Sequence, residues 1–123
     1  MLVPGHNGPS LVVCATCRAP SGEAGGGAAL LAALRAAAGP GDVAVETMAC
    51  LWSCGQGASV QLRAPGKIGY VMGGFDASAA GDLLAFARAY AASTDGEVVF
   101  DAWPPGVLGH FIARVPPPGM LAL

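Results

Sequence analysis

The sequence predicts a single α/β domain in which a mixed β-sheet is flanked by helices. Three observations support this fold class. The chain has 123 residues, of which 54% are hydrophobic, so it is long and apolar enough to bury one core. Two short apolar segments enclose a helical segment, and a hairpin signal follows them. The expected order is β-α-β-β-β-α with a further helix near the end, as in an α/β sandwich.

The first half of the chain predicts a strand, a helix and a second strand. Residues 10–13 form an apolar run with β-branched side chains, typical of a buried strand. Leucines at helical spacing begin after Gly27, and Gly39-Pro40-Gly41 ends that helix. Alternating β-branched residues then predict a strand over 42–48. Because two strands joined by a helix form a right-handed crossover, we expect the strands to be parallel.

The second half predicts a hairpin, a helix, a brief strand and a last helix. Strands over 59–63 and 68–72 are joined by a Pro-Gly turn, and Gly73-Gly74 is expected to end the second strand. Asp76 is expected to cap a helix that Ser93 to Gly96 ends. A short strand is expected over 97–100. The last helix is expected to open at Pro104-Pro105, with apolar residues at helical spacing: Val107, Leu108, Phe111, Ile112 and Val115.

Domain boundaries and compartment follow from composition. We expect a flexible lead-in over 1–9, one domain over 10–116 and a tail over 117–123.

Only 11% of the residues are charged, the net charge is −2, and the basic residues are scattered, which argues against a nucleic-acid partner. No apolar run approaches the ~20 residues of a membrane span, and no signal peptide is visible, so we expect a cytoplasmic protein with no membrane partner.

Four cysteines in two close pairs are the candidate site. Cys14 and Cys17 follow the first predicted strand, and Cys50 and Cys54 follow the second. Because the carboxyl ends of neighbouring parallel strands meet at one edge of a sheet, we expect the two pairs to come within bonding distance. In a reducing cytosol, such pairs favour metal binding or catalysis over structural disulfides.

Three chemistries fit four thiols. A zinc site takes four thiolates, although its pairs usually lie closer together on hairpins. Thiol-disulfide chemistry is suggested by Cys14-Ala15-Thr16-Cys17, but it depends on a helix amino terminus at the first thiol, and residues 18–27 are poor in helix formers. A [2Fe-2S] cluster, in which each iron takes two thiolates, is the third.

The sequence resembles the thioredoxin-like [2Fe-2S] ferredoxins, and more closely a bacterial family of uncharacterised metal-binding proteins that is similar to them. The matching features are the strand ending in Cys14, the pattern Cys50-Leu51-x-x-Cys54, the stretch 70–74 and the closing Ala113-Arg114-Val115-Pro116. The ferredoxins usually have about ten residues between the first two cysteines, whereas this chain has two.

The resemblance implies a thioredoxin-like fold and a homodimer. It also implies a small electron carrier with a [2Fe-2S] cluster on Cys14, Cys17, Cys50 and Cys54, and an unidentified redox partner protein. Some relatives look associated with cobalamin synthesis. The alternative is a protein that holds zinc or cobalt through the same thiolates without redox activity.

Other residues near the cysteines have a structural and a functional interpretation. Trp52 could shield a cluster from water or be an ordinary loop aromatic, and Arg18 could offset cluster charge or be solvated. Gly55 and Gly57 could bring N–H groups to sulfur or form turns. We expect His6 to be solvated and His110 to be a core or edge residue. No catalytic triad, phosphate loop or carboxylate pair is apparent, so we do not expect an enzyme.

Overall fold

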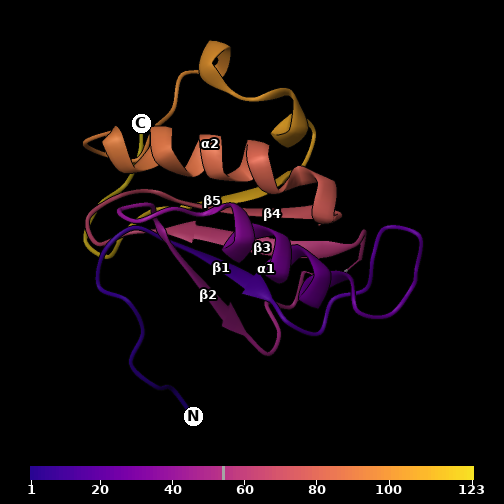
Figure 1. Cartoon of the computed structure of the whole chain (residues 1–123). Helices are drawn as coiled ribbons and strands as arrows, with labels where there is room; N and C mark the ends of the chain where they lie inside the picture. Colours follow the sequence, from indigo (N-terminus) through magenta and orange to yellow (C-terminus); the bar gives the residue numbers. More distant parts are fainter. Residues whose placement is uncertain (54) are drawn as a thin grey trace.

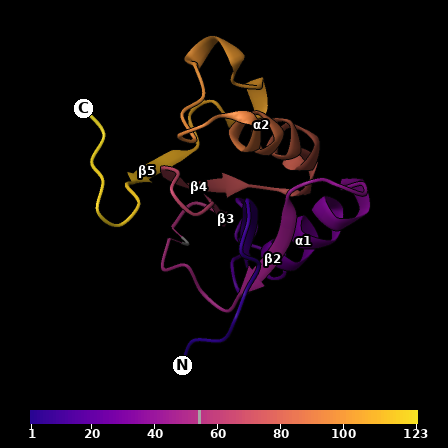
Figure 2. The same ribbon diagram turned by 90° about the vertical axis from the view of Figure 1, so that its left-hand side faces the viewer.

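The computed structural model describes residues 1–53 and 55–123. It contains a five-stranded mixed sheet in the order β2-β1-β3-β4-β5, and two helices pack against it (Figure 1). Both helices lie on the same side of the sheet (Figure 2). The predicted α/β class with a mixed sheet and flanking helices is therefore confirmed, and the arrangement is compatible with a thioredoxin-like fold.

The β-α-β crossover forms as the sequence predicts. Strand β1 (Ser10–Cys14) leads to helix α1 (Gly26–Ala37), and strand β2 (Ala44–Met48) returns beside β1. The two strands are parallel, with Ser10 opposite Ala44 and Cys14 opposite Met48. Their carboxyl ends are therefore level, which sets the positions of the segments that follow each strand.

Strands β3 (Ala58–Arg63) and β4 (Gly69–Phe75) form the predicted hairpin. Gly66 in its turn has φ 72°, a conformation that glycine adopts without strain. Gly73-Gly74 does not end β4, contrary to prediction. Ala58 pairs with Phe75 and Val60 with Met72, so β4 has an extra residue at this point and forms a bulge. The two glycines therefore bend the strand instead of breaking it.

Helix α2 (Ala80–Ala92) follows a short 3-10 turn, Ala77–Ala79. The Asp76 carboxylate accepts a hydrogen bond of 2.9 Å from the Ser78 backbone N–H, which confirms the predicted cap. The helix ends with Ser93 as its C-cap, as predicted.

The last predicted helix and the brief strand over 97–100 are both wrong. The chain instead makes two short 3-10 turns, Phe100–Ala102 and Pro105–Val107, and then strand β5 (Phe111–Val115), which pairs antiparallel with β4. Gly109 has φ 79°, which interrupts any helix there, and the edge of β4 offers backbone groups for pairing.

An aromatic cluster holds β5 in place. Phe111 packs edge-on against Tyr70 and Phe86, with ring centroids 5.5 Å apart in both pairs, and its centroid is 4.4 Å from that of Trp103. The Trp103 indole N–H donates to the Val98 carbonyl at 2.9 Å, so part of the backbone in 97–100 is bonded to a side chain. The apolar residues whose spacing predicted a helix thus belong to strand β5 and to the loop that packs against it.

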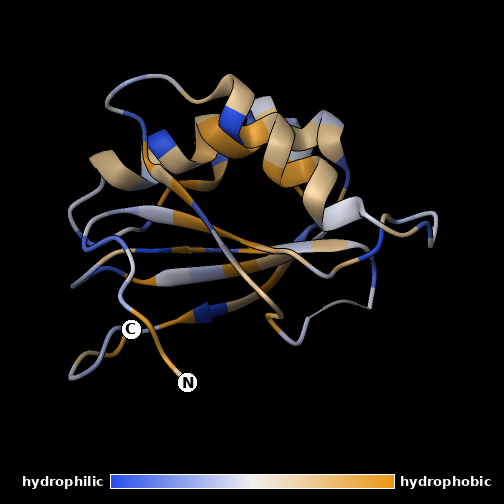
Figure 3. Ribbon diagram, turned by 60° about the horizontal axis from the view of Figure 1, so that its bottom comes forward, coloured by the Kyte–Doolittle hydropathy of each residue, from blue (hydrophilic) through white to orange (hydrophobic). Residues whose placement is uncertain are grey.

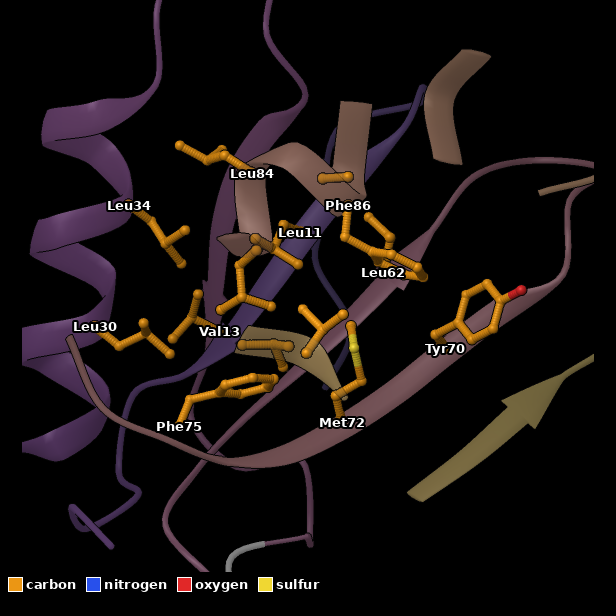
Figure 4. Packing of buried hydrophobic residues seen from close by; sticks show 14 of the residues in the cluster. Leu11, Val13, Leu30, Leu34, Leu62, Tyr70, Met72, Phe75, Leu84 and Phe86 are labelled. Carbon is orange, nitrogen blue, oxygen red and sulfur yellow. The ribbon is translucent and has the colours of Figure 1, made fainter. Parts of the chain in front are cut away.

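The core lies between the sheet and the two helices. Leu30 and Leu34 of α1 point toward Leu11 and Val13 of β1, and all four are fully buried (Figure 4). Burying a side chain of this size contributes about 1.5–3 kcal/mol. The hydropathy colouring shows apolar segments on both the helices and the strands (Figure 3). Strand β1 is buried along its whole length, so the backbone of its last residue, Cys14, is held within the core.

Within residues 1–53 and 55–123, no helix combines the length and apolar character required to cross a membrane.

Candidate cysteine site

The two cysteine loops begin at neighbouring strand ends and are bonded to each other. The Ala15 backbone N–H donates to the Met48 carbonyl at 2.9 Å, and the Thr16 hydroxyl donates to the Ala49 carbonyl at 2.5 Å. The loop that starts at Cys14 is therefore attached to the backbone that leads into Cys50. The parallel register of β1 and β2 is what makes these bonds possible.

Helix α1 starts directly against the first loop. The Gly27 backbone N–H donates to the Cys17 carbonyl at 2.9 Å. A Cβ added to Gly27 would lie 2.0 Å from the Cys14 carbonyl oxygen, so only glycine allows this approach. Helix α1 therefore begins beside the first loop, but its Gly27 N–H faces a carbonyl oxygen and not a sulfur. The expectation that no helix amino terminus activates the first thiol stays a prediction.

Cys14 and Cys17 form a buried pair with 0% and 2% exposure. Burial raises the pKa of Cys14, but hydrogen bonds from Cys17, from the Leu51 backbone N–H and from Thr16 outweigh burial and lower the pKa from the usual 9.0 to about 7. The Thr16 hydroxyl lies 3.7 Å from the Cys14 sulfur. A substantial share of Cys14 is therefore thiolate near neutral pH, which is the form that binds metals.

Cys17 behaves in the opposite way. Burial raises its pKa, and its hydrogen bond to Cys14 raises the pKa further, while bonds from Ser59 partly offset both effects. The Ser59 hydroxyl oxygen lies 3.4 Å from the Cys17 sulfur. The two thiols therefore titrate as one hydrogen-bonded pair, in which ionisation of one thiol makes ionisation of the other harder.

Cys50 is partly buried, and its sulfur accepts a hydrogen bond of 3.3 Å from the Trp52 backbone N–H. Cys54, the fourth predicted ligand, lies outside the described residues. Among residues 1–53 and 55–123, no three His, Cys, Asp or Glu side chains lie close enough together to hold a metal ion. The structure thus brings Cys14 and Cys17 together and places the Cys50 loop beside them, without joining the Cys50 thiol to the pair.

The other loop residues that the sequence analysis singled out make contacts typical of ordinary loop and turn residues. Trp52 is 92% exposed, so it does not shield the thiols from water, and it has φ 59°. Arg18 donates within its own loop to the Gly22 carbonyl at 3.0 Å. Gly57 has φ 123°, and a Cβ there would meet the Pro20 ring at 2.9 Å, as expected of a turn with a close contact. Gly55 has open space around it.

The contacts of the two histidines are with groups other than the thiols. The His110 ring stacks on Phe75 with centroids 4.5 Å apart, and its Nδ1 is 2.8 Å from the Gly73 carbonyl, as expected of an edge residue. The exposed His6 donates its backbone N–H to Glu46 at 2.9 Å.

Sequence reasoning missed the groups that surround the sulfur atoms. Ser59 supplies a hydroxyl, and Leu51, Thr16 and Trp52 supply backbone N–H groups. The visible signal was a serine in each of the apolar strands β1 and β3, Ser10 and Ser59, and both are fully buried. Of the two, Ser59 has a hydrogen-bond partner among the described residues, and that partner is a thiol.

Fold and site together define a small α/β protein with a buried dithiol at the carboxyl end of β1, beside the end of the parallel strand β2. The chain belongs to the family described as "Protein of unknown function (DUF1636)", whose model matches residues 11–117. This match confirms the resemblance to an uncharacterised family, and it includes all four cysteine positions. Neither the curated proteins nor the solved structures contain a significant match. The resemblance to [2Fe-2S] ferredoxins stays a prediction.

Proposed function

We propose that this chain binds a metal centre through Cys14, Cys17, Cys50 and Cys54, and that the centre is a [2Fe-2S] cluster. The observation that carries the proposal is the buried pair Cys14 and Cys17, in which hydrogen bonds lower the pKa of one thiol to about 7. A thiolate is the ligand form of cysteine, and sulfur ligands suit iron-sulfur clusters and zinc.

The donor set fits such a centre. Two soft thiols are already side by side and out of water, and the backbone leading to Cys50 is bonded to their loop. The Trp52 N–H already donates to the Cys50 sulfur, and N–H donors to ligand sulfurs tune the reduction potential of clusters. When bound, a [2Fe-2S] cluster supplies the capacity to accept and return a single electron.

In this proposal the chain carries electrons and is not itself an enzyme. Burial of Cys14 and Cys17 excludes water from the thiols, and the Ser59 hydroxyl and the Leu51 and Thr16 backbone N–H groups offset thiolate charge. Electrons would pass to and from an unidentified redox partner protein. A homodimer, a cytoplasmic location and a role in cobalamin-related metabolism are further parts of the proposal that rest on the family resemblance.

A non-redox metal-binding protein is the alternative from the same four thiolates, with zinc or cobalt bound. Thiol-disulfide exchange is less favoured because Cys14 and Cys17 are 0% and 2% exposed, and exchange requires an attacking thiolate that a substrate can reach.

Colour and metal content separate these functions. Protein purified without oxygen, or reconstituted with iron and sulfide, should be red-brown and bleach with dithionite, with about two irons and two acid-labile sulfides per chain. A zinc form is colourless, and a cobalt-thiolate form is green to blue. Cys50→Ser should abolish or strongly alter the chromophore. A chain that takes up neither iron nor cobalt nor zinc contradicts the proposal.

A further inference from the structure

Ser59 is a buried polar residue whose hydroxyl lies against a proposed ligand. Its side chain is 0% exposed, and its Oγ is 3.4 Å from the Cys17 sulfur. Either atom could be the donor in a thiol pair. A buried hydroxyl without a partner costs free energy, so the Cys17 contact satisfies a group that the strand would otherwise leave unpaired.

The backbone around Ser59 fixes this contact. Val60, the next residue, pairs with Val13 of β1 and with Met72 of β4, so Ser59 is held where β3 lies between two strands. Across the bulge, a Cβ added to Gly73 would lie 3.8 Å from the Ser59 Cβ. Ser59 is thus packed at the point where β1 leaves the sheet toward Cys17, with little freedom to move away.

We propose that Ser59 is a positioning residue that donates an O–H···S hydrogen bond to Cys17 when this sulfur is a metal ligand. This inference rests on the proposed function. A ligand thiolate has no proton, so it can only accept, and the hydroxyl must be the donor. The bond offsets negative charge on the sulfur, and a reduced cluster carries more of that charge. Ser59 therefore strengthens metal binding and makes the reduction potential less negative.

A matched pair of serines tests the proposal in the full chain. Ser10 of β1 is also 0% exposed, and its hydroxyl has no partner among the described residues. Ser59→Ala and Ser10→Ala each remove one buried strand hydroxyl. We expect Ser59→Ala to weaken Co²⁺ binding by about tenfold or more, as for other groups that support a metal ligand, and Ser10→Ala to leave it unchanged.

Two measurements report directly on the Cys17 sulfur. Co²⁺ is titrated while the thiolate-to-cobalt absorption is recorded, and the reduction potential is measured on the iron-loaded protein. Ser59→Ala should have a more negative potential than the wild-type chain, and Ser10→Ala should match the wild-type. If Ser59→Ala does not fold, Ser59→Thr and Ser59→Val give a pair of equal size, of which only the threonine keeps a hydroxyl and should keep the wild-type potential.

The outcomes distinguish the two proposals. Equal affinity and potential in wild-type and Ser59→Ala would overturn the role of Ser59 while leaving the metal centre intact. Equal effects of Ser59→Ala and Ser10→Ala, or of Ser59→Thr and Ser59→Val, would also overturn it, because they indicate packing alone. A wild-type chain that gains no absorption with Co²⁺ and no cluster with iron and sulfide overturns the proposed function instead.

Discussion

Identical side chains behave differently in this site because their neighbours differ. Hydrogen bonds from three residues lower the pKa of Cys14 to about 7, whereas burial and a bond to Cys14 raise that of Cys17. Cys50 is separate from both and accepts from the Trp52 N–H. The sequence predicts the four cysteines as ligands, but it does not reveal which sulfur is ionised or which group donates to it.

Trp52 should report metal loading, because its backbone N–H donates to the Cys50 sulfur at 3.3 Å and its side chain is exposed. Recruitment of Cys50 as a ligand changes this bond, and a bound cluster or Co²⁺ absorbs light close to the indole. We therefore expect tryptophan emission to fall as metal is added. The measurement is a fluorescence titration with Co²⁺.

The control for this titration is Trp52→Phe, which leaves Trp103 as the other tryptophan of the chain. Trp103 lies in the aromatic cluster with Phe86 and Phe111. Most of the metal-dependent change should disappear in Trp52→Phe. A change of the same size in the variant would show that Trp52 does not report on Cys50.

Helices and strands at the start of the chain were predictable because pattern and packing agree there. The apolar residues of β1 and α1 face one core, and the sequence shows a continuous apolar run for β1 and a period of 3.6 for α1. The end of the chain was not predictable in this way. Phe111 and Val115 fit a helical spacing, but the free edge of β4 and the left-handed Gly109 favour a strand.

Two glycines in helices should respond oppositely to alanine. A Cβ on Gly27 would lie 2.0 Å from the Cys14 carbonyl oxygen, so Gly27→Ala must displace α1 from the thiol loop. We expect a loss of stability of about 1–3 kcal/mol, as for other overpacked sites. Gly81 of α2 has nothing within 4 Å of its added Cβ, so Gly81→Ala should stabilise by about 0.5–1 kcal/mol.

Urea denaturation of the two variants measures both effects with one method. Gly27→Ala should also weaken Co²⁺ binding, because it moves the backbone that carries Cys14 and Cys17, whereas Gly81→Ala should leave metal affinity unchanged. Equal stability of Gly27→Ala and wild-type would contradict the close approach of α1 to the loop.

At the scale of the whole chain, the parallel pairing of β1 with β2 could be predicted from the sequence, whereas the position of Ser59 could not. The crossover rule predicts that β1 and β2 are parallel, and this alone sets the two cysteine loops side by side. The position of Ser59 depends on the antiparallel pairing of β3 with β1 and on the bulge of β4. No local pattern in the sequence specifies that register, so the groups around the sulfur atoms emerge only from the assembled sheet.

Acid stability of the whole fold depends on carboxylates that are hydrogen-bonded in the folded state. The Asp42 carboxylate, in the segment between α1 and β2, accepts from Arg88 of α2 at 2.7 and 2.8 Å and from the Gly39 N–H at 3.0 Å. These bonds, with Arg88 as the largest cause, lower the pKa of Asp42 from 3.8 to about 2. Hydrogen bonds also lower the pKa of Asp76 and Asp95.

A carboxyl group whose pKa is lower in the folded than in the unfolded state stabilises the fold when it is ionised in both states. The contribution of Asp42 is therefore complete above about pH 4, and it is lost as the pH falls through about 2. We expect Asp42→Asn to be less stable than wild-type at pH 6, and we expect this difference to shrink steadily between pH 4 and pH 2. Urea denaturation at several pH values gives the comparison.

Asp101→Asn is the matched control, because it makes the same substitution at an exposed aspartate. Its stability should follow that of the wild-type chain at every pH. A difference between Asp42→Asn and wild-type that stays constant from pH 6 to pH 2 would mean that the Asp42–Arg88 pair does not depend on the charge of the carboxylate. The contact between α2 and the segment before β2 would then come from packing and neutral hydrogen bonds alone.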